Sequence, residues 1–302
     1  MRVLVTGISG RIGGLVAREL LEAGHEIVGF DKNPPHEEFR ERVEVIYDDI
    51  TDRLALLRAA RGCEAVVHLA ALPSPGPHAD ETITRVNVVG TQYVLAAAEA
   101  HNIQRVVIAS SGCVFGLVFA KHKFDPQYLP MDDDHPRLPQ DLYGLSKLCN
   151  EETAAAYTRR CGMTTICLRI TAVMRTTGEL HPWFRRMFEY SNVRRSPDLW
   201  NYIEERDLAR AFRLSIEATV EGHHDIIIAA RDSWTPYDIR DLIREHFPSL
   251  SQYCDLFEAD SALYDTRRAE EVLGFVAQNS WRDSPEMKQM ADEVLANQQR
   301  SA

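Results

Sequence analysis

The first 31 residues constrain the fold of this chain more than any other stretch. An apolar run over 2–6 is followed by the glycine-rich segment 7–14, by an amphipathic run that ends at Ala23, and by a second apolar run over 25–30 that ends on Asp31. Strand, glycine loop, helix, strand and acid in this order form the opening of a dinucleotide-binding βαβ unit. Taken alone, the glycines would also fit a plain strand-to-helix turn.

The glycines and the acid each have a physical role in such a unit. Gly7 and Gly10 allow a tight turn and a close approach of the backbone to a pyrophosphate, and Gly13 allows the helix to pack close to the sheet. The helix N-terminus offers free N–H groups and partial positive charge to the phosphates. Asp31, 24 residues after Gly7, is placed to accept hydrogen bonds from a ribose diol and to repel a 2′-phosphate. The predicted cofactor is therefore NAD rather than NADP.

Strand-like segments recur along the chain, and helical patterns lie between most of them. The segments are apolar on both faces, which is typical of a parallel sheet covered by helices, and their spacing is that of βαβ units. The fold class predicted is α/β with a Rossmann-type doubly wound parallel sheet. The predicted strands are 3–6, 27–30, 43–47, 65–69, 105–110, 165–170 and 225–229.

Composition excludes several classes of protein. The 302 residues contain no apolar run long enough to cross a membrane, and Met1-Arg2 leads straight into a strand, so no signal peptide is expected. The six cysteines form no CxxC pair and no metal-ligand spacing, so we expect reduced, mostly buried thiols, a cytoplasmic location and no metal. The net charge of −11 argues against nucleic acid or an anionic membrane as partner, but not against a small anionic substrate.

Two further segments follow predicted strands and are expected at the same edge of the sheet. Asp49 and Ile50 come after the third strand, where an acid can reach an adenine amine. A helix cap is an equally good interpretation of this acid. The fourth strand ends in Ala70 and Ala71, whose small side chains leave space for a flat cofactor.

Three polar features near this edge have competing interpretations. His68 lies inside an apolar strand, where a histidine is more often a hydrogen-bonded core residue than a ligand. The segment 72–80 contains three prolines and is a candidate loop over the substrate. Asn87, in the helical stretch 81–100, either binds a backbone carbonyl or water near the site or is a solvated helix residue.

The strongest catalytic candidates are Ser111, Tyr143 and Lys147. Ser111 ends a predicted strand, whereas Tyr143 and Lys147 lie four residues apart on one face of a helix expected to run to about Cys161. A free tyrosine titrates near pH ~10, and a neighbouring ammonium together with a nicotinamide cation would lower that value. The tyrosine could then take a proton from a hydroxyl as hydride leaves the same carbon, with the serine polarising the oxygen. The YxxxK pattern alone is also an ordinary surface pair.

Together these features resemble the extended short-chain dehydrogenase/reductase family, in its NAD-dependent epimerase/dehydratase branch, over nearly the whole chain. The matching segments are TGxxGxxG from Thr6, the ribose acid Asp31, Asp49-Ile50, HLAA from His68, the SxxVFG segment from Ser111, YxxxK from Tyr143, the segment from Tyr202 to Ala209 that resembles YVHVxDLA, and the late segments from Asp265 to Ala269 and from Leu273 to Phe275.

The resemblance implies a sheet of about seven strands, a smaller C-terminal substrate lobe and a homodimer. It implies an NAD-binding domain of residues 1–170 with 202–230, and a substrate-binding lobe of residues 171–201 with 231–302. It also implies Ser111, Tyr143 and Lys147 as the catalytic triad. The residues expected to contact NAD are Gly7, Gly10, Arg11, Ile12, Gly13, Asp31, Lys32, Asp49, Ile50, Leu69, Ala70, Ala71, Asn87, Tyr143, Lys147 and Ile170.

Departures from the family's patterns concern the substrate. Dehydratases of the family place an Asp-Glu pair after the active-site serine or threonine, whereas this chain has Gly112 and Cys113, which argues against dehydration. Over 168–176 it lacks the asparagine and the Gly-Pro turn that UDP-sugar epimerases carry, and Trp200-Asn201 replaces their arginine and aspartate. A diphosphate could instead be held by a group of arginines that otherwise forms a solvated face. These are Arg185, Arg186, Arg194 and Arg195.

The same departures resemble uronate and aldose dehydrogenases of the branch. In that interpretation the sugar is surrounded by Ser74, Ser111, Gly112, Thr171 and Arg175, with Arg175 facing a carboxylate. The segment from Ser111 to Gly116 is more similar to that of the epimerases. The main hypothesis is therefore a nucleotide-sugar epimerase, and the alternative is an NAD-dependent dehydrogenase of a free aldose or uronate. A non-catalytic NAD-sensing regulator is a third possibility, although such proteins tend to lose the tyrosine or the lysine.

Overall fold

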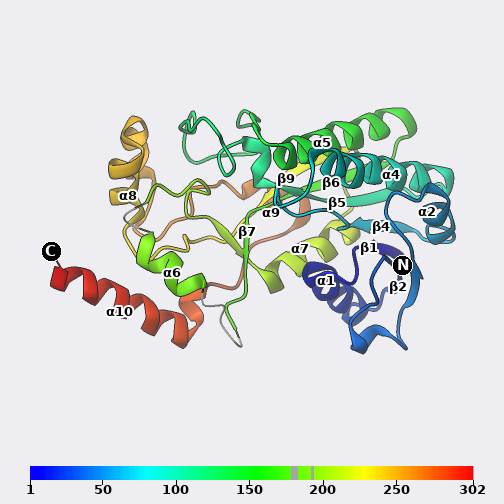
Figure 1. The fold of residues 1–302 in the computed structure, drawn as a ribbon, viewed down its shortest axis with the longest axis horizontal. Coiled ribbons are helices and arrows are strands. Elements are labelled where there is room, and N and C mark those ends of the chain that lie inside the picture. Colours follow the sequence, from blue (N-terminus) through cyan, green and yellow to red (C-terminus); the bar gives the residue numbers. More distant parts are fainter. Residues whose placement is uncertain (178–182, 192–193, 302) are drawn as a thin grey trace.

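The computed structural model describes residues 1–177, 183–191 and 194–301. Its centre is a seven-stranded sheet in the order β3-β2-β1-β4-β5-β6-β9, in which every neighbouring pair is parallel (Figure 1). Each strand lies within two residues of a segment predicted from sequence, which confirms the Rossmann-type fold. The strands are β1 (Arg2–Thr6), β2 (Glu26–Asp31), β3 (Glu44–Tyr47), β4 (Ala65–His68), β5 (Arg105–Ser111), β6 (Thr164–Ile170) and β9 (His223–Ile228).

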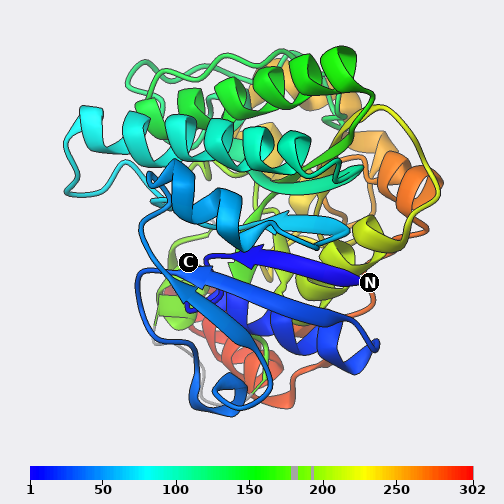
Figure 2. The same ribbon diagram turned by 90° about the vertical axis from the view of Figure 1, so that its right-hand side faces the viewer.

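Helices cover both faces of this sheet because its strands are apolar on both sides (Figure 2). On one face, Val5 and Val107 pack with α1 (Arg11–Glu22), α7 (Glu205–Glu217) and α9 (Arg267–Leu273). On the other face, Leu4 and Val106 pack with α2 (Arg53–Ala59), α4 (Gly90–Ala100) and α5 (Leu142–Cys161). In Figure 2 the blue helix α1 lies below the sheet, and the cyan and green helices α4 and α5 lie above it.

The remaining elements form a second, smaller lobe with a core of its own. Its core includes Met174, Trp200, Phe247 and Trp281. Residues of the segment 114–131 pack into this core, although the predicted division assigns them to the NAD-binding domain. The elements of the lobe are β7 (Ala172–Met174), α6 (Trp183–Tyr190), β8 (Tyr202–Glu204), α8 (Ile239–His246), η4 (Pro248–Leu256), η5 (Trp281–Asp283) and α10 (Pro285–Ser301).

Short helical turns complete the chain. The stretch 81–100, predicted as one helix, contains a π-helical turn between two α-helical parts. These turns and the remaining helix are η1 (Glu37–Phe39), α3 (Asp80–Ile83), η2 (Thr84–Val89) and η3 (Gly112–Phe115). No helix in the described ranges is both long and apolar enough to cross a membrane. All six cysteines are free and four of them are buried, as expected of reduced thiols.

The sheet brings the predicted site together at one edge. The carboxyl ends of parallel strands meet at the same edge, where folds of this class bind their ligands. Gly7 follows β1, Leu69 follows β4, Ser111 ends β5 and Thr171 follows β6.

Candidate active site

The glycine loop after β1 has no room for side chains. Gly7 has φ +75°, and a Cβ on it would lie 2.7 Å from the backbone nitrogen of Ala70. A Cβ on Gly13 would lie 2.0 Å from the carbonyl oxygen of Gly7. The loop therefore presents bare backbone at the start of α1, which suits the close approach of a pyrophosphate.

Replacing Gly13 with alanine should disrupt this loop. We expect NAD binding to weaken at least ~10-fold and the free energy of unfolding to fall by ~1–3 kcal/mol, because the overlap forces the backbone to move. Calorimetric titration with NAD and urea unfolding measure the two effects. Gly24→Ala is a control for NAD affinity only: nothing lies within 4 Å of its added Cβ, but the φ of +83° at Gly24 is itself unfavourable for alanine. NAD affinity of Gly13→Ala equal to that of the wild type would contradict the assignment of the loop.

Two cavities meet at the glycine loop. The larger, of about 540 Å³, lies at the ends of β1, β5 and β6, and the smaller, of about 260 Å³, lies at the ends of β2 and β3. They form a continuous groove along the carboxyl edge of the sheet. Both are lined by Gly7, Gly10, Leu69 and Ala71.

The smaller cavity holds the residues predicted for the adenosine half of the cofactor. Asp31 is oriented by two backbone amides, with Oδ2 accepting from Ser9 N at 3.0 Å and Oδ1 accepting from Asn33 N at 2.9 Å. Its carboxylate is thus fixed at the end of β2. The cavity is also lined by Lys32, Asp49, Ile50 and Ala70.

Asp49 lies at the cavity, as expected of an adenine contact, and it also bonds the start of the next turn, as expected of a cap. Its Oδ1 accepts hydrogen bonds from the N–H and the hydroxyl of Thr51, at 2.9 and 2.7 Å, and these bonds lower its pKa. The cap of α2 is instead Asp52, which accepts from Ala55 N. Asp49 therefore shapes a turn at the rim of the cavity that it lines.

Replacing Asp31 with alanine should relax the preference for NAD. Removing a carboxylate that repels a 2′-phosphate should raise the ratio of NADP to NAD affinity by about tenfold, since ~1.4 kcal/mol corresponds to that factor. Asp31→Asn removes the charge but keeps an acceptor for a backbone amide, so it should shift the ratio in the same direction. An unchanged ratio in cofactor titrations of both variants would remove Asp31 from the ribose site.

Ser111, Tyr143 and Lys147 all line the larger cavity. Tyr143 and Lys147 lie in the first two turns of α5, whose N-terminus is capped by the Asp141 side chain accepting from Gly144 N at 2.8 Å. Lys147 Nζ donates to the carbonyl oxygen of Ala109 at 2.7 Å and lies 5.7 Å from the centroid of the Tyr143 ring. The Ser111 hydroxyl oxygen accepts from Cys113 N at 3.1 Å. The sheet and α5 thus bring the three predicted catalytic side chains to one cavity.

Burial dominates the electrostatics of this group. It raises the pKa of Tyr143 well above its usual value, and the nearby Ser111 hydroxyl offsets only part of the effect. Burial also lowers the pKa of Lys147 to about 8. Desolvation of the phenolate is the largest effect among the protein's own groups, and the lowering expected from Lys147 together with a nicotinamide cation stays a prediction. A neutral Tyr143 is suited to donate a proton.

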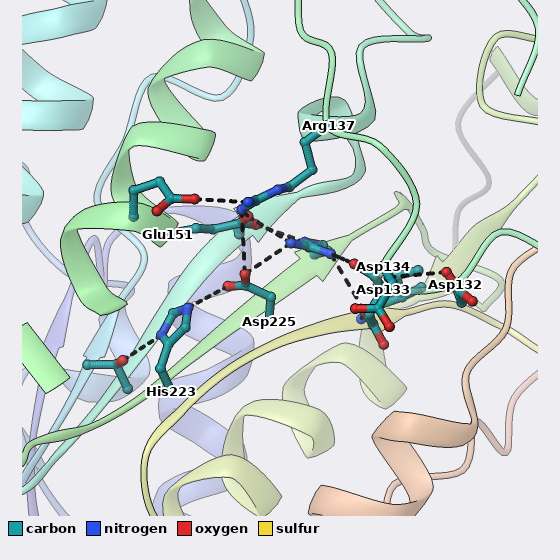
Figure 3. A network of polar contacts seen from close by, with 12 residues as sticks. Asp132, Asp133, Asp134, Arg137, Glu151, His223 and Asp225 are labelled. Carbon is teal, nitrogen blue, oxygen red and sulfur yellow. Dashed lines mark hydrogen bonds and ion pairs between the residues drawn. The ribbon is translucent and has the colours of Figure 1, made fainter. Parts of the chain in front are cut away.

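A buried network of ion pairs connects the helix and the strands that carry the catalytic side chains. Glu151, one turn of α5 beyond Lys147, accepts a hydrogen bond from Ser110 Oγ at 2.6 Å and two from Arg169 at 3.0 and 2.9 Å. In Figure 3 the carboxylates of Glu151 and Asp225 both point toward the guanidinium of Arg137. Arg169 also donates a hydrogen bond to Asp225 at 3.0 Å. Glu151 and Arg169 are at most 2% exposed, so the network ties α5 to β5 and β6.

Among the described residues, one group with the spacing of metal ligands overlaps this network. Ligand atoms of Cys167, His223 and Asp225 lie within 4.8 Å of one another. However, Asp225 lies 3.0 Å from Arg169 and 3.8 Å from Arg137, so two cations already balance its charge. The arrangement is better described as an ion-pair network than as a metal site.

Three predicted site residues lie outside the groove. Asn87 is fully buried in η2, and its amide binds the backbone N–H and carbonyl of Leu72 and the hydroxyl of Ser146. It therefore positions the loop after β4, which confirms the interpretation that it binds a backbone carbonyl near the site. Arg175 pairs with Glu205 at 2.7 Å and lines another pocket, which shares Arg11 with the larger cavity. Ser74 lines neither cavity of the groove.

The other predicted residues line the groove, together with some that the sequence analysis missed. Arg11, Ile12, Gly112, Ile170 and Thr171 line the larger cavity. These further residues reach it from the second lobe or from the segment after β5; Cys113 lies within the motif that begins at Ser111, whereas no pattern in the sequence singles out the others. The further residues include Cys113, Val118, Phe119, Asp198 and Tyr264. His68 is a core residue as expected, bonded to Thr6 and Thr91.

The predicted arginine group divides into different environments. Arg186 and Arg194 both lie over the ring of Tyr190, at 5.9 and 5.0 Å, on the surface. Arg195 pairs with Asp125 at 2.7 Å and lines another cavity of about 260 Å³, with Lys123 and Val118. Val118 also lines the larger cavity, so these two cavities adjoin. The side chain of Arg185 lies outside the described residues.

Known proteins share this architecture. The chain is 34% identical over 176 residues to the uronate dehydrogenase of Pseudomonas putida, covering 56% of this chain and 60% of that protein. It is 26% identical over 271 residues to the UDP-glucose 4-epimerase of Corynebacterium glutamicum, covering 81% and 80%. The structure of the UDP-glucose 4-epimerase of Thermotoga maritima with UDP-glucose superposes over the full length of both chains, with a TM-score of 0.71 and 19% identity. The model of the NAD dependent epimerase/dehydratase family matches residues 3–229. The chain belongs to the NAD dependent epimerase/dehydratase family.

Proposed function

We propose that this protein is an NAD-dependent sugar oxidoreductase that transfers a hydride at a carbinol carbon of a nucleotide sugar and acts as an epimerase. The observation that carries the proposal is the convergence of Ser111, Tyr143 and Lys147 in a cavity that the glycine loop also lines. A proton acceptor, a hydroxyl donor and a cofactor loop in one cavity match the needs of hydride transfer at a carbinol.

The groove fits NAD. The bare backbone at Gly7 and Gly13 leaves space for a pyrophosphate, and the fixed carboxylate of Asp31 suits a ribose diol. The two cavities would hold the two halves of the dinucleotide. The chemistry that a bound nicotinamide supplies is reversible uptake of a hydride, so that oxidation of the carbinol gives a carbonyl and NADH.

The chain's own residues handle the proton and the oxygen. Tyr143 takes the hydroxyl proton during oxidation and returns it to the carbonyl oxygen during reduction. Because burial raises its pKa, the proton-accepting form needs positive charge beyond that of Lys147, which an oxidised nicotinamide carries. Lys147 is held near the ring by Ala109. Ser111 donates to the substrate oxygen and polarises the bond.

Epimerisation of a nucleotide sugar is favoured over oxidation of a uronate by the surroundings of the cavity. The adjoining cavity contains Lys123, and Arg195 in its ion pair with Asp125, and both cations suit phosphate groups. Arg175, the residue proposed for a uronate carboxylate, does not line the larger cavity and pairs with Glu205. The relative named as a UDP-glucose 4-epimerase also aligns over more of its length than the uronate dehydrogenase. Net oxidation of a free aldose or uronate remains the second candidate because the first half-reaction is the same.

A substrate panel tests the proposal. The protein is incubated with NAD and with UDP-sugars, dTDP-sugars, free aldoses or uronates, while nicotinamide absorbance is followed and products are identified. A new sugar isomer without net NADH is the expected result. Net NADH from a free sugar would favour the dehydrogenase, and no conversion of any member would favour an NAD-sensing regulator.

We also propose the domain division, the location and the oligomeric state, all on the basis of the family resemblance. Residues 1–170 with 202–230 would hold NAD, and residues 171–201 with 231–302 would hold the sugar, with the segment 114–131 packed against the second lobe. The protein would be a cytoplasmic homodimer that binds neither nucleic acid nor membranes. Light scattering after size-exclusion chromatography tests the dimer.

A further inference from the structure

Two polar side chains from the second lobe line the larger cavity without a role in binding NAD or in moving the proton. They are Asp198, in the segment between α6 and β8, and Tyr264, which precedes α9. The Tyr264 hydroxyl lies 3.7 Å from the position of a Cβ on Gly112, next to Ser111. Tyr264 is therefore beside the catalytic serine, and Asp198 lies in the wall of the same cavity.

The carboxylate of Asp198 is only partly satisfied by the protein. Its Oδ1 accepts from Trp200 N at 3.0 Å and from the Ser196 hydroxyl. Among the residues that the structure describes, none gives Oδ2 a hydrogen bond of good geometry. The buried indole N–H of Trp234 also lacks a hydrogen bond, and burial raises the pKa of Asp198. An acceptor oxygen is therefore available to a ligand.

Tyr264, the second of these side chains, is buried. It is 7% exposed, and within the described ranges no hydrogen bond to its hydroxyl is found. Burial raises its pKa, and the negative charge of Asp198 adds to this effect, which keeps the phenol neutral. A neutral phenol beside a carboxylate offers a donor and an acceptor at one wall of the cavity.

The cations of the cavity are already engaged. In the described part of the chain, the basic side chains that line it are Arg11 and Lys147. Lys147 donates to Ala109, and Arg11 donates to the carbonyl oxygen of Val173 and lies 3.6 Å from Glu205. A carboxylate on the sugar would thus meet Asp198 without a free cation to balance it.

We infer that Asp198 and Tyr264 are specificity-determining residues that bind hydroxyl groups of a neutral sugar, and that Asp198 excludes uronic acids from the cavity. Asp198 accepts hydrogen bonds from sugar hydroxyls, and Tyr264 donates to a sugar oxygen. This inference rests on the proposed function and names its substrate class as a neutral hexose or pentose, carried by a nucleotide.

The test compares UDP-glucose with UDP-glucuronic acid, which differ by one carboxylate. Dissociation constants are measured by calorimetry on the NAD-loaded protein, and kcat and KM are measured for each sugar that turns over. The wild type should bind UDP-glucose at least ~30-fold more tightly than UDP-glucuronic acid. Asp198→Asn should weaken UDP-glucose binding and strengthen UDP-glucuronic acid binding, and so reduce this ratio by ~10-fold or more.

Two further variants separate specificity from folding. Tyr264→Phe removes a hydroxyl that has no protein partner, so it should raise KM for UDP-glucose by ~5–10-fold and leave NAD affinity unchanged. Asp255→Asn, on the surface, is the matched control and should leave the ratio as in the wild type.

The outcomes distinguish this inference from the proposed function. Preference for UDP-glucuronic acid in the wild type would overturn the inference alone, and so would a ratio unchanged in Asp198→Asn. Selective binding of UDP-glucose without turnover would leave the inference standing and overturn the proposed catalysis.

Discussion

Replacing Tyr143 with phenylalanine should lower kcat by ~10²–10⁴-fold, the usual contribution of a general acid–base group. The substitution removes only the hydroxyl oxygen. The ring keeps its edge-on contact with Phe119, at a centroid distance of 6.2 Å, and Lys147 keeps its bond to Ala109. NAD affinity should therefore stay within about twofold of the wild type.

Turnover on the best substrate of the panel and calorimetric titration with NAD measure the two quantities. Tyr128→Phe is the matched control because its hydroxyl bonds Asp132 and it does not line the larger cavity. It should turn over normally. Normal turnover by Tyr143→Phe would mean that another group moves the proton.

Replacing Arg169 with methionine should lower the free energy of unfolding by ~3–5 kcal/mol, the usual cost of leaving one buried partner of an ion pair uncompensated. Glu151 is fully buried and receives two hydrogen bonds from Arg169. After the substitution it would retain only Ser110 and the more distant Arg137, at 3.3 Å. Desolvation of a carboxylate without its main cation is the cause of the loss.

Urea unfolding measures this effect. Combining Arg169→Met with Glu151→Leu should recover only part of the loss, because the buried charge of Glu151 is removed while Asp225 still loses its bond to Arg169. Arg244→Met, which breaks a pair on the surface with Asp241, should leave the unfolding midpoint unchanged. A loss below ~1 kcal/mol in Arg169→Met would show that other groups balance Glu151.

The fold could be predicted from sequence because its signals are local and repeated. The glycine loop and Asp31 lie within one βαβ unit, and the apolar runs mark the strands directly. Tyr143 and Lys147 could be paired because helical geometry fixes residues four apart. These features need no knowledge of long-range packing.

The rest of the site depends on contacts between distant segments. Arg175 follows β7, but its direction is decided by Glu205 at the start of α7. Asn87 lies in a π-helical turn, and its choice between a backbone carbonyl and solvent is decided by the loop after β4, which it bonds at Leu72. Asp198 and Tyr264 reach the cavity only through the packing of the second lobe, so their positions could not be read from spacing.

The most direct measurement follows a deuterium label at the carbinol carbon of a UDP-hexose, with NAD and the wild-type protein. Hydride removal and return within one site should give the epimer with deuterium retained at that carbon and without net NADH. An epimer that has lost its deuterium to water would show that a proton, not a hydride, leaves this carbon, and it would contradict the proposed mechanism.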